Sequence, residues 1–390
     1  MKKKPLIIIG ITIATIVVLV AILYSLNLYK SYKTPYGHFE RVGNLNESRA
    51  GHKSFLMSDG KVLIVGGIKE IKNDYFDIPK EYVDSIELFN PNTKKFEIRL
   101  KEKSLSNFKT YNIHRLSANE IVFINVDDNI VAIYNYKTNT LKTIKYPRIP
   151  KKNYRYTVLN NGEILIYGGF ELNDPTYWQK SIGLFDPHNN NYKHLDYNNL
   201  FSEKSSVYAL PDNNIAIFNN KTRTIYNIKS NKVIDKSNIN IPANFIVDLL
   251  FNSILQTYEV VLIKKNNDDY SVYALYNFLT NESTYLGETN YKGYSCKVNV
   301  LNDKELLFSA CICYSEFIIE NCKNAEIFNR DKRKFVILNG QKSGAEISTV
   351  NTKSKSVLLT GGRLRSYNFS NERIDVKTLK DAKVFKFKNN

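Results

Sequence analysis

The chain has 390 residues, of which 43% are hydrophobic and 24% are charged, a composition typical of globular proteins. This composition excludes a disordered or collagen-like chain, and four cysteines in this length exclude a small disulfide-stapled scaffold. The 27 Tyr and 21 Phe residues favour β-structure, because aromatic side chains fit half-buried pleated surfaces. The formal net charge is +17.

Residues 5–29 contain no charged side chain, and about 20 apolar residues are enough to cross a bilayer as a helix. We predict that residues 1–29 form a cytoplasmic tip and a transmembrane signal anchor, followed by a linker over 30–37. A cleaved signal peptide is the alternative, but it would have a shorter apolar region and a small-residue cleavage site. Positive charge upstream of the span favours a cytoplasmic N-terminus, with the remainder of the chain extracytoplasmic; the flanking lysines are Lys2, Lys3, Lys4, Lys30 and Lys33.

The basic excess is spread over short clusters, such as residues 101–103 and 331–334, and forms no long basic block. One interpretation is attraction to an anionic surface, such as a cell-wall polymer or lipid headgroups. The other, which we favour, is a compositional preference for Lys, Asn, Ile and Tyr that makes the charge incidental. We expect no binding to nucleic acid, because an external domain rarely meets it.

One pattern recurs along the chain: an apolar anchor, a polar turn and then an aliphatic strand. Successive anchors lie 43 to 59 residues apart, and each copy predicts a β-hairpin. The six clear copies begin at Met57, Leu116, Leu159, Leu210, Leu255 and Leu301, and a looser seventh begins at Val350.

A second pattern follows each hairpin: a short strand that ends in an aromatic residue and then Asn or Asp, as in Phe89-Asn90 and Tyr134-Asn135. Asn and Asp suit the first position of a tight turn, because their side chains accept hydrogen bonds from nearby backbone amides. Each turn leads into a fourth strand, so each unit has strands a, b, c and d. Four antiparallel strands in 45 to 50 residues are typical of one propeller blade. The sequence predicts an all-β, seven-bladed propeller over residues 38–390.

Three units carry a diglycine at the end of strand b, at residues 66–67, 168–169 and 361–362. Here the chain resembles the kelch-repeat family, strongly in units 1 and 3, fairly in unit 7 and in degenerate form elsewhere. Arg49-Ala50-Gly51-His52 in the first unit is a further kelch-like element. The resemblance implies a propeller whose b–c and d–a loops share one face, where partners commonly dock.

The seventh unit ends after its third strand, and an unassigned strand over residues 38–42 precedes the first unit. We predict that this N-terminal strand supplies strand d of the last blade. Such closure would remove exposed sheet edges and would place the membrane anchor at the rim of the propeller.

All four cysteines fall in the sixth unit. If Leu301 faces Leu306 across the hairpin, antiparallel pairing places Cys296 opposite Cys311 at a distance that suits a disulfide. Cys313 and Cys322 then remain as a second pair. Outside the cell two disulfides are favoured, with free thiols and a metal site as alternatives, although C-x-C lacks the usual zinc-site spacing.

The sequence offers no recognisable catalytic constellation. The predicted topology separates His52 from His188 and His194, and the chain has no nucleophile elbow, Walker loop or HExxH helix. Galactose oxidase is a kelch-like propeller enzyme with copper bound by His and Tyr, but no part of its site matches positions here. We therefore expect no catalytic residue, metal or cofactor.

The long b–c loops, over residues 68–84, 170–180 and 363–380, supply candidate binding residues: Tyr75, Phe76, Tyr177, Trp178, Arg363, Arg365 and Tyr367. Aromatic and arginine side chains often anchor interfaces, although Tyr and Phe also pack between blades. We predict a membrane-anchored, extracytoplasmic module that binds a protein or a glycan. The alternatives are a carbohydrate-active propeller enzyme, either a sugar epimerase or mutarotase or an oxidase-like enzyme, and a purely structural envelope protein.

Overall fold

The computed structural model describes residues 17–19 and most of residues 37–387. Of the predicted span 5–29, only Val17, Val18 and Leu19 are described, and these are helical. Within the described residues no helix has the length and apolar character needed to cross a membrane. The gaps within 37–387 are 70–80, 109–111, 126–127, 147–150, 153–154, 169, 172–181, 196–199, 202–204, 220–221, 240–258, 266–270, 278, 291–296, 310–311, 316–317, 322–324, 339–347, 352–355, 362, 369–372 and 379.

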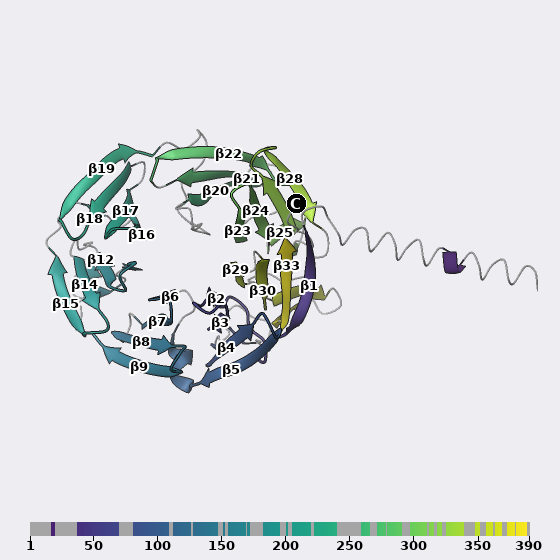
Figure 1. Cartoon of the computed structure of the whole chain (residues 1–390), viewed down its shortest axis with the longest axis horizontal. Coiled ribbons are helices and arrows are strands. Elements are labelled where there is room, and N and C mark those ends of the chain that lie inside the picture. The colour runs from purple at the N-terminus through teal and green to yellow at the C-terminus, as the bar shows by residue number, and fades with distance from the viewer. Residues whose placement is uncertain are drawn as a thin grey trace, which may run out of the picture.

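Six four-stranded antiparallel sheets, the blades, stand side by side in a ring, each with strand a of its sequence unit innermost (Figure 1). We number each blade by the sequence unit that supplies it. Blade 1 is β2 (Lys53–Leu56), β3 (Val62–Val65), β4 (Ser85–Asn90) and β5 (Lys95–Lys101), and blade 2 is β6 (Ile113–Arg115), β7 (Glu120–Asn125), β8 (Ile130–Asn135) and β9 (Thr140–Lys145). Blade 3 is β11 (Arg155–Val158), β12 (Ile164–Tyr167), β14 (Ile182–Asp186) and β15 (Asn191–Leu195), and blade 4 is β16 (Ser206–Ala209), β17 (Asn214–Asn219), β18 (Thr222–Asn227) and β19 (Lys232–Asn238).

The ring continues through a three-stranded sheet supplied by the fifth sequence unit: β20 (Glu259–Lys265), β21 (Ser271–Asn277) and β22 (Glu282–Glu288). Blade 6 is β23 (Lys297–Asn302), β24 (Glu305–Ser309), β27 (Ala325–Asn329) and β28 (Lys334–Leu338), and blade 7 combines β29 (Ser348–Asn351), β30 (Ser356–Thr360) and β33 (Asp381–Phe387) with β1 (Gly37–Asn44). The all-β propeller is confirmed, but the described residues form six four-stranded blades where seven were predicted. The first strand predicted for the fifth unit, near Leu255, lies outside the described residues.

Within the described part of residues 37–387, three two-stranded sheets and one helix lie outside the blades. β10 (Lys151–Lys152) pairs with β13 (Phe170–Glu171), β25 (Ile312–Ser315) with β26 (Ile318–Asn321), and β31 (Arg363–Asn368) with β32 (Arg373–Thr378). A 3₁₀ helix, η1 (Lys103–Asn107), connects blade 1 to blade 2.

The N-terminal strand β1 is the outermost strand of blade 7, in the order β1-β33-β30-β29. Its register on β33 runs from Gly37 opposite Phe387 to Asn44 opposite Asp381, with one irregularity between Arg41 and Gly43. The two ends of the described ring therefore belong to the same sheet, and β1 lies beside β33 at the rim (Figure 1).

The hydrophobic core lies between successive blades, which explains why the b strands are continuously apolar. In β3, Leu63 and Val65 pack toward blade 2, whereas Val62 and Ile64 pack toward blade 7. Alternate residues of a strand point to opposite faces of its sheet, so a sheet packed on both faces buries every position of its central strands. Phe218 of blade 4 contacts Tyr276 of β21, with ring centroids 6.0 Å apart, and extends this packing to the three-stranded sheet.

The aromatic–Asn pattern forms the turn between strands c and d. The Asn135 Oδ1 atom accepts hydrogen bonds from the backbone amides of Lys137 and Thr138. The Tyr134 hydroxyl donates to the Oδ1 atom of Asn139, which holds a left-handed φ of 56°. The same Tyr–Asn hydrogen bond recurs in Tyr226–Asn231 and Tyr276–Asn281. The motif therefore fixes both ends of the turn.

The cysteine-bearing hairpin of blade 6 has a different register from the one predicted. Val300 faces Leu306, and the register shifts between Val300 and Asn302, so Leu301 does not oppose Leu306. The argument that placed Cys296 opposite Cys311 is therefore wrong. Cys296, Cys311 and Cys322 lie outside the described residues, and Cys313 is in β25 opposite Glu320. The structure gives the predicted disulfides no support.

The diglycines mark left-handed backbone at the end of strand b. Gly66, Gly168 and Gly361, the first glycine of each pair, have φ values of 68°, 67° and 61°. At Gly361 an added Cβ would lie 2.4 Å from the Arg49 carbonyl oxygen and 2.6 Å from His52 Cε1. Only glycine fits there without displacing the segment that leads into blade 1.

We expect Gly361→Ala to destabilise the protein by more than the roughly 1–2 kcal/mol that left-handed backbone costs a residue with a Cβ. The matched control is Gly162→Ala, because Gly162 also has positive φ but an added Cβ would lie 3.6 Å from its nearest neighbour. Chemical denaturation of both variants measures the difference. Equal losses of unfolding free energy would show that the contact with Arg49 is unimportant.

Candidate functional site

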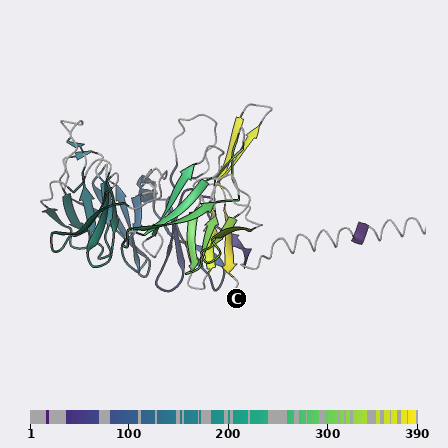
Figure 2. The ribbon, with the colours of Figure 1, turned by 90° about the horizontal axis from the view of Figure 1, so that it is seen from above.

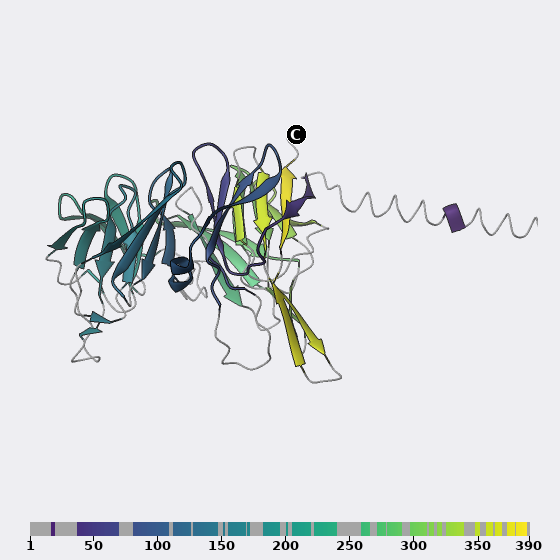
Figure 3. The same cartoon turned by 90° about the horizontal axis from the view of Figure 1, so that it is seen from below.

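One face of the ring carries the additional hairpins, and we call it the hairpin face. The β31–β32 hairpin and the small β10–β13 sheet project from this face, on the side away from the C-terminus (Figures 2 and 3). β26 lies against β31, so the β25–β26 and β31–β32 hairpins of adjacent blades support each other. The hairpin face therefore carries hairpins that are not part of any blade.

The sequence placed Arg363, Arg365 and Tyr367 in a loop, but the structure places all three in β31. They occupy alternate positions of the strand, opposite Thr378, Val376 and Ile374 of β32. Tyr75, Phe76, Tyr177 and Trp178 lie outside the described residues, and their placement stays a prediction.

A fully buried ion pair holds the connections of blade 1 at its seam with blade 7. The Arg49 Nη2 atom lies 2.8 Å from Glu87 Oε1, and both side chains are 0% exposed. Arg49 also donates to the carbonyl oxygens of Gly66 and Ser85, while Glu87 accepts from the backbone amides of Asn46 and Glu47. Burial lowers the pKa of Arg49, and Glu87 opposes that shift. The pair therefore ties strand c and the end of strand b to the segment before β2.

Sequence reasoning identified Arg49 as part of a kelch-like element but missed its partner Glu87. The available indication was a carboxylate in the otherwise apolar strand 85–90, because charged residues are rarely buried without a partner. Blade 6 repeats part of this arrangement: the buried Glu326 accepts from the backbone amide and the side-chain amide of Asn290. The same Asn–Glu contact thus fixes the segment before strand a in blades 1 and 6.

His52 joins blade 1 to blade 7. Its Nε2 atom lies 2.8 Å from the Thr360 hydroxyl, and its Nδ1 atom has no hydrogen-bond partner in the described part of the chain. Burial lowers the pKa of His52 well below its usual value, and the nearby Arg49 lowers it further. The imidazole is therefore neutral in the folded protein at neutral pH.

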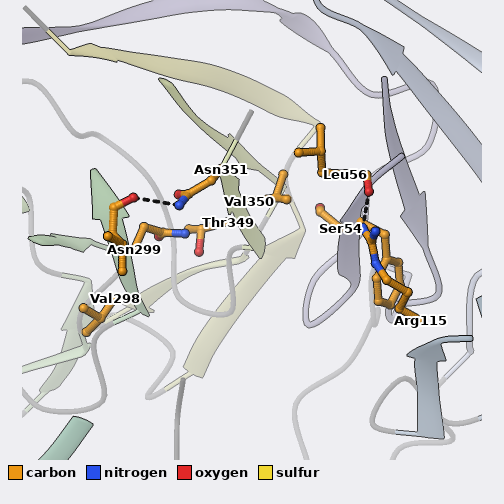
Figure 4. Close-up of a pocket in the computed structure, with 10 residues that line it drawn as sticks. Ser54, Leu56, Arg115, Val298, Asn299, Thr349, Val350 and Asn351 are labelled. Carbon is orange, nitrogen blue, oxygen red and sulfur yellow. Dashed lines mark hydrogen bonds between the residues drawn. The ribbon is translucent and has the colours of Figure 1, made fainter. Parts of the chain in front are cut away.

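A cavity of about 430 Å³ lies between innermost strands of the ring (Figure 4). Arg115 donates to the Leu56 carbonyl oxygen, and the Asn351 side-chain amide donates to the Val300 carbonyl oxygen at 2.7 Å. These hydrogen bonds cross from one blade to the next. The cavity is lined by Ser54, Phe55 and Leu56 of β2, Arg115 of β6, Val298, Asn299 and Val300 of β23, and Thr349, Val350 and Asn351 of β29.

Among the described residues, no group of three or more His, Cys, Asp or Glu side chains is arranged to hold a metal ion. His52 is buried at the seam of blades 1 and 7, His188 is exposed in a turn of blade 3 beside Glu120, and His194 is exposed on β15. The described part of the chain therefore brings these histidines to no common point.

Comparison with known proteins finds no matching family model and no matching curated protein. A solved structure of a fungal alcohol oxidase of the AA5 family, in complex with copper, is similar with a TM-score of 0.56. It is 9% identical, and the match covers 90% of this chain and 76% of that chain. The chain has a propeller fold. At this identity the likeness shows the fold alone, and the kelch-repeat identity expected from the diglycines is not confirmed.

We expect acid to weaken the propeller through His52. The unfolded state takes up a proton near pH 6.5 whereas the folded state does not, so stability is fully present above that pH and falls below it by up to about 1.4 kcal/mol per pH unit. His52→Gln keeps a polar group near Thr360 without a titrating ring and should flatten this dependence, measured by denaturation at pH 7.5 and 5.5. His194→Gln, at an exposed position, is the control that should behave like the wild type. A His52→Gln protein as acid-sensitive as the wild type would contradict this assignment.

Proposed function

We propose that the chain is a membrane-anchored, extracytoplasmic propeller that binds a partner protein through its hairpin face. The observation that supports this proposal is the pair of mutually supporting hairpins, β25–β26 and β31–β32, in the b–c connections of blades 6 and 7. Neither hairpin completes a blade. Hairpins that are not needed to form the blades are typical of binding loops, which a rigid scaffold holds in position.

The residues of β31 and β32 favour a protein partner. In the register of this hairpin Arg363 pairs with Thr378, Arg365 with Val376 and Tyr367 with Ile374. Tyr and Arg are enriched among the residues that dominate interface energies, and aliphatic neighbours exclude water from such anchors. The intervening positions pair Leu364 with Lys377, Ser366 with Asp375 and Asn368 with Arg373, and none of these residues is aromatic.

The membrane anchor is proposed from the uncharged stretch over residues 5–29. β1 begins at Gly37 in the outermost strand of blade 7, so a span that ends near residue 29 would attach at the rim. An attachment at the rim leaves the hairpin face open to a partner.

Photocrosslinking tests the partner surface. With p-benzoylphenylalanine at position 367 of the membrane-anchored chain, we expect one discrete adduct in intact cells. The same probe at position 366, the adjacent residue on the other face of β31, is the matched control and should give little adduct. Arg363→Ser with Arg365→Ser should abolish the adduct, whereas Arg373→Ser with Lys377→Ser removes the same charge and should preserve it. Equal adducts at 366 and 367, or none at either, would contradict the proposal.

Thiol labelling tests the location of the propeller. In a chain without its four cysteines, Ile234→Cys introduces one thiol at a position that is 62% exposed on β19. We expect a membrane-impermeant maleimide to label this thiol in intact cells. The unsubstituted cysteine-free chain is the control for background. Labelling only after the membrane is broken would place the propeller in the cytoplasm and overturn the proposed orientation.

A further inference from the structure

The β31–β32 hairpin has one strand edge that pairs with nothing in the described part of the chain. Its sheet consists of β31 and β32, and no other described strand pairs with β32. β26 lies beside β31, the other strand of the hairpin. The hairpin projects away from the blades (Figures 2 and 3). An edge of this kind presents backbone N–H and C=O groups that can pair with another strand.

The edge of β32 lacks a feature that protects other outer strands of the molecule. β1, β5, β19 and β22 each have an irregularity in the register with their neighbour, and such bulges discourage pairing between edges. β32 pairs with β31 without an irregularity, from Arg363 opposite Thr378 to Asn368 opposite Arg373. A two-stranded hairpin is only marginally stable in water, and further strands stabilise it. The regular edge of β32 therefore favours an additional strand.

The residues of β32 are complementary to a second copy of the same strand. The strand alternates charged residues, Arg373, Asp375 and Lys377, with β-branched residues, Ile374, Val376 and Thr378. Antiparallel pairing of two copies about Val376 places Asp375 of each copy opposite Lys377 of the other. It also places Ile374 opposite Thr378. Opposite charges at cross-strand positions stabilise a strand pair, whereas like charges destabilise it.

Other registers of two β32 strands are less favourable. Parallel pairing in register would place Asp375 beside Asp375 of the second copy. Antiparallel pairing about Asp375 does the same, and it also places Arg373 opposite Lys377. Antiparallel pairing about Ile374 places Arg373 opposite Asp375, but it pairs only residues 373–375 of the strand. The charge pattern therefore favours the register about Val376.

We propose that two copies of this chain form a dimer through β32, in which the two β32 strands pair antiparallel about Val376. The strand order across the two copies is then β31-β32-β32-β31. A twofold axis at Val376 uses the same edge in both copies, so the contact closes after two chains. The residues proposed to bind a partner protein, Arg363, Arg365 and Tyr367, lie on β31. The dimer is therefore separate from the partner complex and does not depend on it.

Disulfide trapping tests the dimer and its register, with the full-length chain purified in detergent and its four cysteines removed. Val376→Cys places two thiols opposite each other, so mild oxidation should give a disulfide-linked dimer on a non-reducing gel. Ile374→Cys is the matched control, because its two thiols would be offset by roughly 14 Å along the strands, beyond the reach of a disulfide. We expect dimer formation to be at least about tenfold faster at position 376. No disulfide at position 376, or equal rates at both positions, would overturn the proposal.

Charge reversal tests the complementarity. In the Val376→Cys chain, Asp375→Lys and Lys377→Asp should each slow disulfide formation by about tenfold or more, because each variant places like charges opposite each other twice. The two changes together restore opposite charges and should restore the rate. Within the hairpin, Asp375 pairs with Ser366 and Lys377 pairs with Leu364, so charge reversal breaks no charged cross-strand pair there. A combined variant as slow as the single variants would overturn the assigned register.

Discussion

The pairing of β1 with β33 is the contact on which the ring depends. It joins Gly37–Asn44 to Asp381–Phe387, so the two ends of the described ring lie in one sheet. Blade 7 then offers an apolar face to each neighbour, to blade 1 through Leu358 and to blade 6 through Leu359. Without this strand, blade 7 would keep an unpaired edge, and the seam that contains Arg49, His52 and Gly361 would lose its outer support.

At the inner edge of the ring, unpaired backbone carbonyl groups are satisfied in a different way. Side chains of the innermost strands donate to carbonyl oxygens of the neighbouring blade, as Lys53 does to Ile113, Arg155 to Ser205 and Thr157 to Val207. Long basic side chains suit this role, because they reach across the gap and carry only donors. The basic residues of these strands therefore help to join the blades.

Much of the fold can be predicted from the sequence, because the hairpins and the aromatic–Asn turns produce local patterns. Alternating burial of residues marks the strands, and the Asn side chains cap the turns. What the sequence did not reveal depends on contacts between distant segments. The irregularity beside Leu301 shifts a register by one residue, and nothing in the local pattern marks it. Glu87 is 38 residues from Arg49, and its burial is explained only once the two strands meet. Residues 363–380, which contain the β31–β32 hairpin, were interpreted as a loop because they connect strands b and c of the seventh unit. Cavity residues such as Asn299 and Asn351 look like ordinary polar strand residues until the ring brings them together.

The closing strand also orders events during synthesis. Among the described strands β1 leaves the ribosome first and β33 last, so hydrogen bonds between them cannot form until all the strands between them have been made. Throughout that interval β1 has an exposed edge, which is prone to pairing with other strands. A product truncated before residue 381 has no partner for this strand and cannot close the ring. Closure therefore requires every strand up to β33, and a chain that lacks β33 would leave the ring open to chaperones and proteases.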